Sequence, residues 1–215
     1  PKIYTVYTNG TAIYYNLETN TKCDGYTEAN STTGTKTGCM KWYTFNDEGD
    51  KSSTVNMILD HNTTAGVAWN SLNSNNEMRE IVTVLTDDTK TWNSSLNARL
   101  ITADEIAKIT GNTNFSSMSS TDWFCFDTNE SDRISWCKKS KGTSKYAWLF
   151  DYTYECTNYG CIVSDSHATG YWTSTAYALG SLAWNVDAYG RLNGDNVSSI
   201  NRGVRPVIAI SKSII

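Results

Sequence analysis

The sequence predicts an α+β protein with many short strands and little helix. Before residue 61, aromatic and β-branched runs alternate with turn residues, as in strands joined by turns. Between residues 74 and 111, apolar residues recur at helical spacing after two helix-capping patterns. Beyond residue 113, short aromatic runs alternate with polar loops. Strands followed by helices favour the α+β class. At 215 residues, with no stretch of linker composition, the chain is expected to form one domain over 1–215.

The N-terminal segment reads KIYTVYT-NG-TAIYYN, which predicts a β-hairpin. Its centre, Asn9-Gly10, is a dipeptide that tolerates positive φ at both central positions of a type I′ turn. Ile3–Thr8 is the expected first strand. Residues 1–37 are thus expected to form a hairpin followed by a Thr-, Gly- and Ser-rich loop that a disulfide closes.

β-Branched and aromatic runs predict further strands. The longer ones are Met40–Asn46, Thr54–Asp60 and Val204–Ile210, and Pro206 in the last favours an edge or bulge position. Shorter aromatic segments alternate with the loops between them, at Asp122–Phe126, Tyr146–Tyr152 and Tyr171–Thr173.

Two helices are predicted from their caps. Ser74 followed by Glu77 has capping-box spacing, and the apolar period behind it predicts a helix over about 77–88. Thr102 with Glu105 repeats this pattern, and Gly111 stands where a left-handed C-terminal cap is needed. The second helix is therefore expected to be short and to end at Gly111.

The cysteines fall into three local couples, for which we predict three disulfides: Cys23 with Cys39, Cys125 with Cys137, and Cys156 with Cys161. Free buried thiols are the alternative; zinc is disfavoured, since no CxxC spacing occurs and His61 and His167 are the only histidines. Disulfides favour an extracellular or cell-surface location. The chain shows neither a signal peptide nor a membrane-spanning apolar run, so we expect any export signal or anchor to lie upstream of Pro1.

Charge excludes one class of partner. The net charge of −4 provides no basic patch for a polyanion, so nucleic acid is not expected to bind.

The C-terminal region alternates between two kinds of position. From Gly170 it reads GYWTSTAYALGSLAWNVDAYGRLNGDNVSSINRGVRPVIAISKS, in which aromatic, Gly and Val residues alternate with Tyr, Arg, Asn and small polar residues. A packed frame interleaved with exposed side chains is typical of a rigid scaffold that presents a contact surface. This pattern favours recognition over catalysis.

This C-terminal pattern, ending in GVRPVI, and the central stretches TVNMILDHNTTAGVAWN and ARLITADEIAKITG resemble bacterial secreted or surface proteins with a C-type-lectin-like fold. More narrowly, the end resembles the variable proteins that diversity-generating retroelements alter by adenine mutagenesis. The resemblance covers the chain from about Gly38 to the C-terminus. It implies small antiparallel sheets, two flanking helices, long loops, first and last strands that pair with each other, and a ligand-facing variable region at 170–207.

The resemblance also divides this region into two sets of residues. The frame would consist of Gly170, Tyr171, Trp172, Thr173, Ser174, Thr175, Gly180, Ser181, Ala183, Trp184, Val186, Gly190, Leu192, Val197, Gly203, Val204, Arg205 and Pro206. The ligand-binding positions would be Tyr177, Ala178, Leu179, Leu182, Asn185, Asp187, Tyr189, Arg191, Asn193, Asp195, Asn196, Ser198, Ile200, Asn201 and Arg202.

Residue types in the variable region agree with adenine mutagenesis. An asparagine codon mutated at its adenines cannot yield Lys, Glu, Met or Trp. Between Ala176 and Arg202 there is no Lys, Glu or Met, and the single Trp is the frame residue Trp184. The mixture of rigid Tyr, Arg and adaptable polar groups is also typical of antibody-like binding surfaces. Replacing Tyr177, Tyr189 and Arg191 by Ala is expected to abolish binding with little loss of stability.

Other chemistries are weaker predictions. Calcium-dependent sugar binding in C-type lectins usually uses a Trp-Asn-Asp run, which Val186 interrupts here in Trp184-Asn185-Val186-Asp187. Calcium also needs several oxygen ligands that converge on one point, and scattered carboxylates do not provide them. Formylglycine-generating oxidases have an ending similar to GVRPV, but Cys156 and Cys161 lack cationic neighbours that would activate a thiolate. Five tryptophans are more consistent with the core than with sugar stacking: Trp69, Trp92, Trp148, Trp172 and Trp184.

The sequence thus predicts a bacterial ligand-binding surface protein, with no enzymatic activity, no cofactor, no metal and an unidentified protein or cell-surface ligand. Two alternatives remain open. The chain could be a structural subunit of a surface or pilus-like assembly, or, less consistently with its residues, an oxidase of the formylglycine-generating type.

Overall fold

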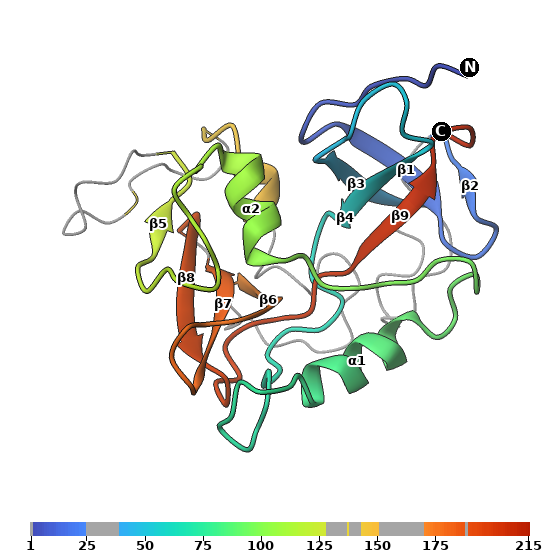
Figure 1. Ribbon diagram of the computed structural model, residues 1–215. Coiled ribbons are helices and arrows are strands. Elements are labelled where there is room, and N and C mark those ends of the chain that lie inside the picture. The colour runs from blue at the N-terminus through green and yellow to red at the C-terminus, as the bar shows by residue number, and fades with distance from the viewer. Residues whose placement is uncertain (1, 25–38, 128–136, 138–142, 151–169, 188) are drawn as a thin grey trace.

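The computed structural model describes residues 2–24, 39–127, 137, 143–150, 170–187 and 189–215. Within these residues the strands form two antiparallel sheets, one of five strands and one of four, accompanied by two α-helices and one 3-10 turn (Figure 1). The predicted α+β class is confirmed. Among the described residues, no helix is both long and apolar enough to cross a bilayer.

The five-stranded sheet has the order β2-β1-β3-β4-β9. Its strands are β2 (Thr21–Lys22), β1 (Ala12–Asn16), β3 (Cys39–Phe45), β4 (Thr54–Leu59) and β9 (Val207–Ser211). The predictions for β3 and β4 are correct to within one residue at each end. As expected for a strand next to a proline, β9 begins directly after Pro206 and lies at the edge of the described sheet.

The N-terminal hairpin was predicted incorrectly. Residues 3–8 form no strand, and β1 pairs with β2 and β3 instead. A turn does form at Asn9-Gly10, but of these two residues only Gly10 has a positive φ, so its type is not I′. Asn9 instead uses its side chain, which accepts a hydrogen bond from the backbone N–H of Asn46 (2.7 Å). A long-range contact therefore decides the turn geometry.

The predicted pairing of the first and last strands is also wrong. The partner of β9 is β4, with Met57 opposite Ile208, while β1 lies on the far side of β3. Both termini nevertheless lie beside the same sheet, as Figure 1 shows. Strand β4 takes the place next to β9 because its alternate residues Val55 and Met57 share an apolar cluster with Ile208 and Ile210.

The four-stranded sheet has the order β5-β8-β7-β6. Its strands are β5 (Phe124–Cys125), β8 (Arg191–Asn196), β7 (Leu182–Asp187) and β6 (Gly170–Ala176). The aromatic segments predicted at 122–126 and 171–173 therefore contain strands. The segment predicted at 146–152 differs, since its described part forms the 3-10 turn η1 (Ala147–Leu149).

Two helices cover the sheets, and the second was the better predicted. In α2 (Ala103–Thr110), Thr102 and Glu105 form the reciprocal capping box, and Gly111 closes the helix with φ of 74°. Helix α1 (Glu80–Thr89) begins three residues later than predicted and has no side-chain cap. Residues before it serve tertiary contacts instead, because the Glu77 carbonyl accepts a hydrogen bond from Asn70 (3.0 Å).

Three apolar clusters form the core. One lies between α2 and the four-stranded sheet, one on the five-stranded sheet, and one beneath α1, where Ile81 and Leu85 meet Trp172 and Val204. Four of the five tryptophans predicted to be core residues are buried: Trp69, Trp92, Trp172 and Trp184. Disulfides Cys23–Cys39 and Cys125–Cys137 join the couples predicted, whereas Cys156 and Cys161 lie outside the described residues.

Candidate functional site

The C-terminal four-stranded sheet has two different faces. In the register of β7 with β8, Val186 lies opposite Leu192, and both pack with Trp184 in the cluster beneath α2. Asn185 lies opposite Asn193, and Ala183 opposite Asp195, on the other face. The first face is therefore apolar throughout, whereas the second is mixed: Ala183 and Trp172 pack in the cluster beneath α1, and the polar residues of β8 lie beside them.

An ion pair stabilises this polar face at one end. The Nε of Arg191 donates to Asp187 (2.5 Å), which also accepts from the backbone N–H groups of Tyr189 and Arg191. Both side chains are largely buried, at 14% exposure for Arg191 and 3% for Asp187. The Arg191 guanidinium also stacks 5.2 Å from the ring of Trp123. Asp187 is therefore a structural residue, whose side chain is buried and not presented at the surface as the sequence had led us to expect.

Arg202 organises the middle of the same face. Its Nε donates to Asn185 (2.7 Å), and its Nη2 lies 3.2 Å from the Asp195 carboxylate. Asn185 in turn donates to the Asn193 carbonyl (2.9 Å) and is fully buried, so its side chain too is not presented at the surface as expected. Burial lowers the pKa of Arg202, an effect that the neighbouring carboxylates of Asp195 and Asp187 oppose.

Tyr177 belongs to the apolar face. Its ring lies 4.3 Å from that of Trp184, its hydroxyl donates to the Thr121 carbonyl, and it covers Gly194 so closely that a Cβ there would meet the Tyr177 ring at 2.7 Å. Tyr177, like Arg191, thus has structural contacts. We now expect replacement of either residue to reduce stability, in contrast to what the sequence suggested.

The exposed positions concentrate at one end of the sheet. The β6–β7 turn and the loop after β8 are adjacent, because Val197 donates to the Ser181 carbonyl (2.9 Å) and Leu182 lies opposite Asn196. Exposed there are Ala178, Leu179, Ser198, Ile200 and Asn201, whereas exposed Tyr189 lies at the opposite end of β7. Half-buried are Tyr177, Leu182, Arg191, Asn193, Asp195, Asn196 and Arg202.

The backbone of the β6–β7 turn is held by a residue that sequence reasoning missed. The Asn75 amide donates to the carbonyls of Tyr177 (2.8 Å), Leu179 (3.1 Å) and Leu182 (2.9 Å), and its backbone N–H donates to Gly180 (3.2 Å). All these acceptors are main-chain atoms. The turn is therefore fixed without using the side chains that it presents. An asparagine next to a predicted helix cap gives no sequence signal for this role.

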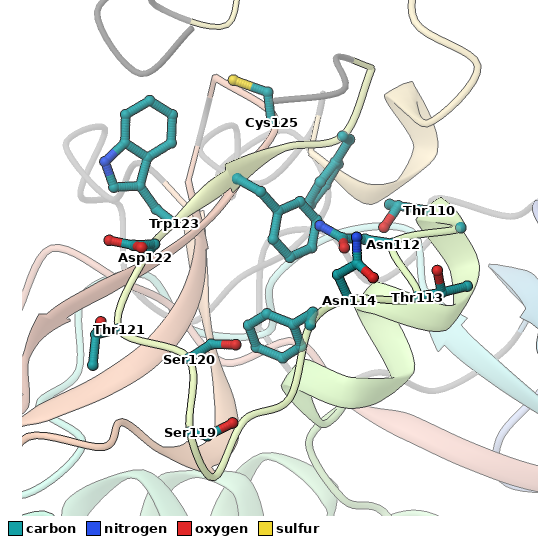
Figure 2. Close-up of a pocket in the computed structure, with 14 residues that line it drawn as sticks. Thr110, Asn112, Thr113, Asn114, Ser119, Ser120, Thr121, Asp122, Trp123 and Cys125 are labelled. Atoms are coloured by element: carbon teal, nitrogen blue, oxygen red, sulfur yellow. The ribbon is translucent and has the colours of Figure 1, made fainter. Parts of the chain in front are cut away.

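A pocket of about 610 Å³ lies beside this sheet, and the sequence did not predict it. It is lined by residues 110–115 and 119–126, which run from the end of α2 to β5. Figure 2 shows the amides of Asn112 and Asn114 close together on one side, with Ser119 and Ser120 from the returning loop on another. Tyr177 and Arg191 hold this loop through Thr121 and Trp123. Only the folding back of the loop brings these residues together.

Within the described residues, no three His, Cys, Asp or Glu side chains are grouped so that they could hold a metal ion. No protein-family model matches the chain, and neither the curated proteins nor the solved structures that were searched contain a match.

Proposed function

We propose that the protein binds a ligand, through side chains presented at the β6–β7 end of the four-stranded sheet. The observation that carries this proposal is the anchoring of the turn by Asn75, whose amide bonds only main-chain carbonyls. The exposed Leu179 and Ile200, at 57% and 62% exposure, project from a backbone that is already ordered. A preordered backbone lowers the entropic cost of binding, which suits a recognition surface.

We further propose an extracellular or bacterial cell-surface setting and a diversified, C-type-lectin-like recognition domain. The two disulfides fit an oxidising compartment. Diversification requires a frame that tolerates changes in the side chains between its members. Burial of Trp172, Trp184 and Val186 beside exposed Leu179 and Ile200 supports such a division of roles. A protein or another molecule on a neighbouring cell is the ligand class that this surface favours.

A binding array tests the proposal. The intact protein is applied to purified extracellular bacterial and host proteins, beside a variant with Leu179→Ala, Ile200→Ala and Asn201→Ala. We expect the wild type to bind one or few proteins, and the triple variant to lose this binding at an unchanged melting temperature, because the replaced side chains are exposed. The matched control carries Ile3→Ala, Val6→Ala and Met118→Ala, at exposed apolar side chains away from the β6–β7 end of the sheet.

Equal loss of binding in the control variant, or binding that survives in the triple variant, would refute recognition by this end of the sheet. The alternative, a structural subunit, predicts self-association and no array signal. The neighbourhood of the gene tests diversification separately. A near-identical template copy with adenine-rich asparagine codons beside a reverse transcriptase gene would support it, and their absence would refute it while leaving ligand binding intact.

A further inference from the structure

The lining of the pocket at residues 110–126 has an unusual balance of charge. The 14 described residues of the lining include one carboxylate, Asp122, and among them there is no lysine, arginine or histidine. These described residues offer an anionic ligand no cationic partner, and a single carboxylate cannot supply the oxygen ligands that a hard cation needs. The described part of the lining therefore favours an uncharged ligand.

Several polar groups of the lining have no hydrogen-bonding role among the described residues. The amides of Asn112 and Asn114 and the hydroxyls of Thr113 and Ser119 make no side-chain hydrogen bond there. Figure 2 shows the two amides close to each other on one side of the pocket. Each amide can donate and accept at once. Paired donor and acceptor groups match adjacent hydroxyls, which also donate and accept.

The floor of the pocket is aromatic and rigid. Phe115 packs edge-on against Phe124 (5.5 Å between centroids) and against Trp184 (5.0 Å), which is fully buried. Phe124 and Phe126 are each 5% exposed and belong to the main core, so half-buried Phe115 is the ring of this cluster that is available to a ligand. A supported aromatic ring beside the two amides suits a molecule with one apolar face and a rim of hydroxyls.

We propose that this pocket binds a neutral hexopyranose, either free or at the end of a glycan, without a metal ion. The ring C–H face would lie on Phe115, and the hydroxyls would bond the amides of Asn112 and Asn114. The volume of about 610 Å³ lies in the ~300–1,000 Å³ range of small-molecule sites and accommodates one or two sugar rings. This site is separate from the β6–β7 turn, and none of the three side chains replaced in the array experiment lines it.

Two-dimensional NMR of the ¹⁵N-labelled intact, oxidised protein tests the proposal. The probes are the methyl glycosides of glucose, mannose, galactose and N-acetylglucosamine, with maltotriose for a glycan end, all in the presence of EDTA. We expect at least one probe to produce saturable shifts at residues 110–126, including the side-chain amides of Asn112 and Asn114. Asn112→Ala with Asn114→Ala should weaken binding about tenfold or more, because two hydrogen bonds are lost.

Asn97→Ala is the matched control, because Asn97 is exposed and its amide also makes no hydrogen bond among the described residues. It should leave the affinity unchanged. Asn114→Ala alone guards against misfolding of the double variant and should give an intermediate loss. The proposal is overturned if no probe shifts these residues, if binding persists in the double variant, or if inorganic phosphate or glucose 6-phosphate binds more tightly than the neutral sugars. Failure of the array experiment would leave these outcomes unaffected.

Discussion

Arg205 joins the end of β4 to the 3-10 turn η1 through hydrogen bonds to main-chain carbonyls. It is 1% exposed, and it donates to four carbonyls: Leu59 (2.5 Å), Leu149 (2.8 Å), Asp60 (3.2 Å) and Trp148 (2.6 Å). Its guanidinium also lies 5.0 Å from the centre of the Tyr171 ring. The sequence placed Arg205 in the frame by resemblance; its planar fork explains why arginine is required there.

We therefore predict that Arg205→Lys destabilises the protein by about 3 kcal/mol, because a single ammonium cannot reach all four carbonyls and leaves buried acceptors unpaired. Chemical denaturation at neutral pH measures the change. Arg99→Lys is the control, since Arg99 makes a forked pair with Glu105 (2.7 and 2.9 Å) but is 40% exposed. Such an exposed pair is worth about 1 kcal/mol or less. Similar losses in the two variants would contradict this role of Arg205.

At the scale of elements, two sequence segments with capping-box spacing form different structures. Thr102 and Glu105 form the predicted capping box of α2, because every contact they need lies within one turn of helix. Ser74 and Glu77 have the same spacing but do not cap a helix. Asn75 instead donates to the β6–β7 turn, and the Glu77 carbonyl accepts a hydrogen bond from Asn70. Local chemistry is readable from the sequence. A competing long-range hydrogen bond is not.

The candidate site follows the same rule. Alternation of apolar and polar residues identified Trp184 and Val186 as packed frame residues, since this depends only on the period of a strand. Burial of Asn185 and Asp187 could not be predicted in the same way. Asn185 is buried by its hydrogen bond with Arg202, which lies 17 residues away in the chain, and Asp187 by its ion pair with Arg191. The pocket requires residues 110–126 to fold back on themselves, for which no motif exists.

The turn between β6 and β7 permits a test of how an element keeps its shape. Asn75→Ala removes three hydrogen bonds to the turn but keeps the backbone bond to Gly180. We predict that the turn amides, residues 177–182, exchange with solvent about tenfold faster, corresponding to about 1–2 kcal/mol of lost local stability. Hydrogen exchange measured by NMR or mass spectrometry resolves this segment.

Two further variants make the exchange experiment specific. Asn75→Asp preserves the shape but cannot donate, and it places a charge beside three carbonyls, so its effect should exceed that of alanine. Leu179→Ala removes an exposed side chain and should leave exchange unchanged. If Leu179→Ala accelerated exchange as much as Asn75→Ala, the turn would depend on the residues it presents, and the separation of frame from display would fail.

At the scale of the whole molecule, stability against acid depends on two buried carboxylates. Burial alone would raise the pKa of Asp47, but hydrogen bonds from Lys212 (2.6 Å) and from the N–H groups of Tyr7 and Gly49 outweigh it, so the pKa is lowered. Burial likewise acts against ionisation of Asp60, yet contacts with His61 and Tyr43 lower its pKa. Both carboxylates are ionised more readily in the folded protein than in the unfolded chain.

The sign of the pH dependence follows from this difference. A carboxylate with a lowered folded pKa contributes stability that is complete above its unfolded pKa and is lost as pH falls through the folded pKa. We predict that the free energy of unfolding is nearly constant above about pH 5 and declines below about pH 4. Urea denaturation at a series of pH values measures this profile.

The Asp47→Asn variant measures how much of the loss of unfolding free energy at low pH comes from the Asp47–Lys212 ion pair. Asp47 and Lys212 are 1% and 0% exposed, and they join the loop after β3 to the end of β9. The variant leaves a buried ammonium without its carboxylate, which costs about 3 kcal/mol at neutral pH. Its acid decline should be shallower, because one titrating group is gone. Asp50→Asn, three residues away, affects only an exposed pair with Lys51 and should reproduce the wild-type profile. An unchanged acid decline in Asp47→Asn would exclude the Asp47–Lys212 pair as a source of acid sensitivity and leave Asp60 and Glu80, whose pKa the hydrogen bonds from Ser71 also lower.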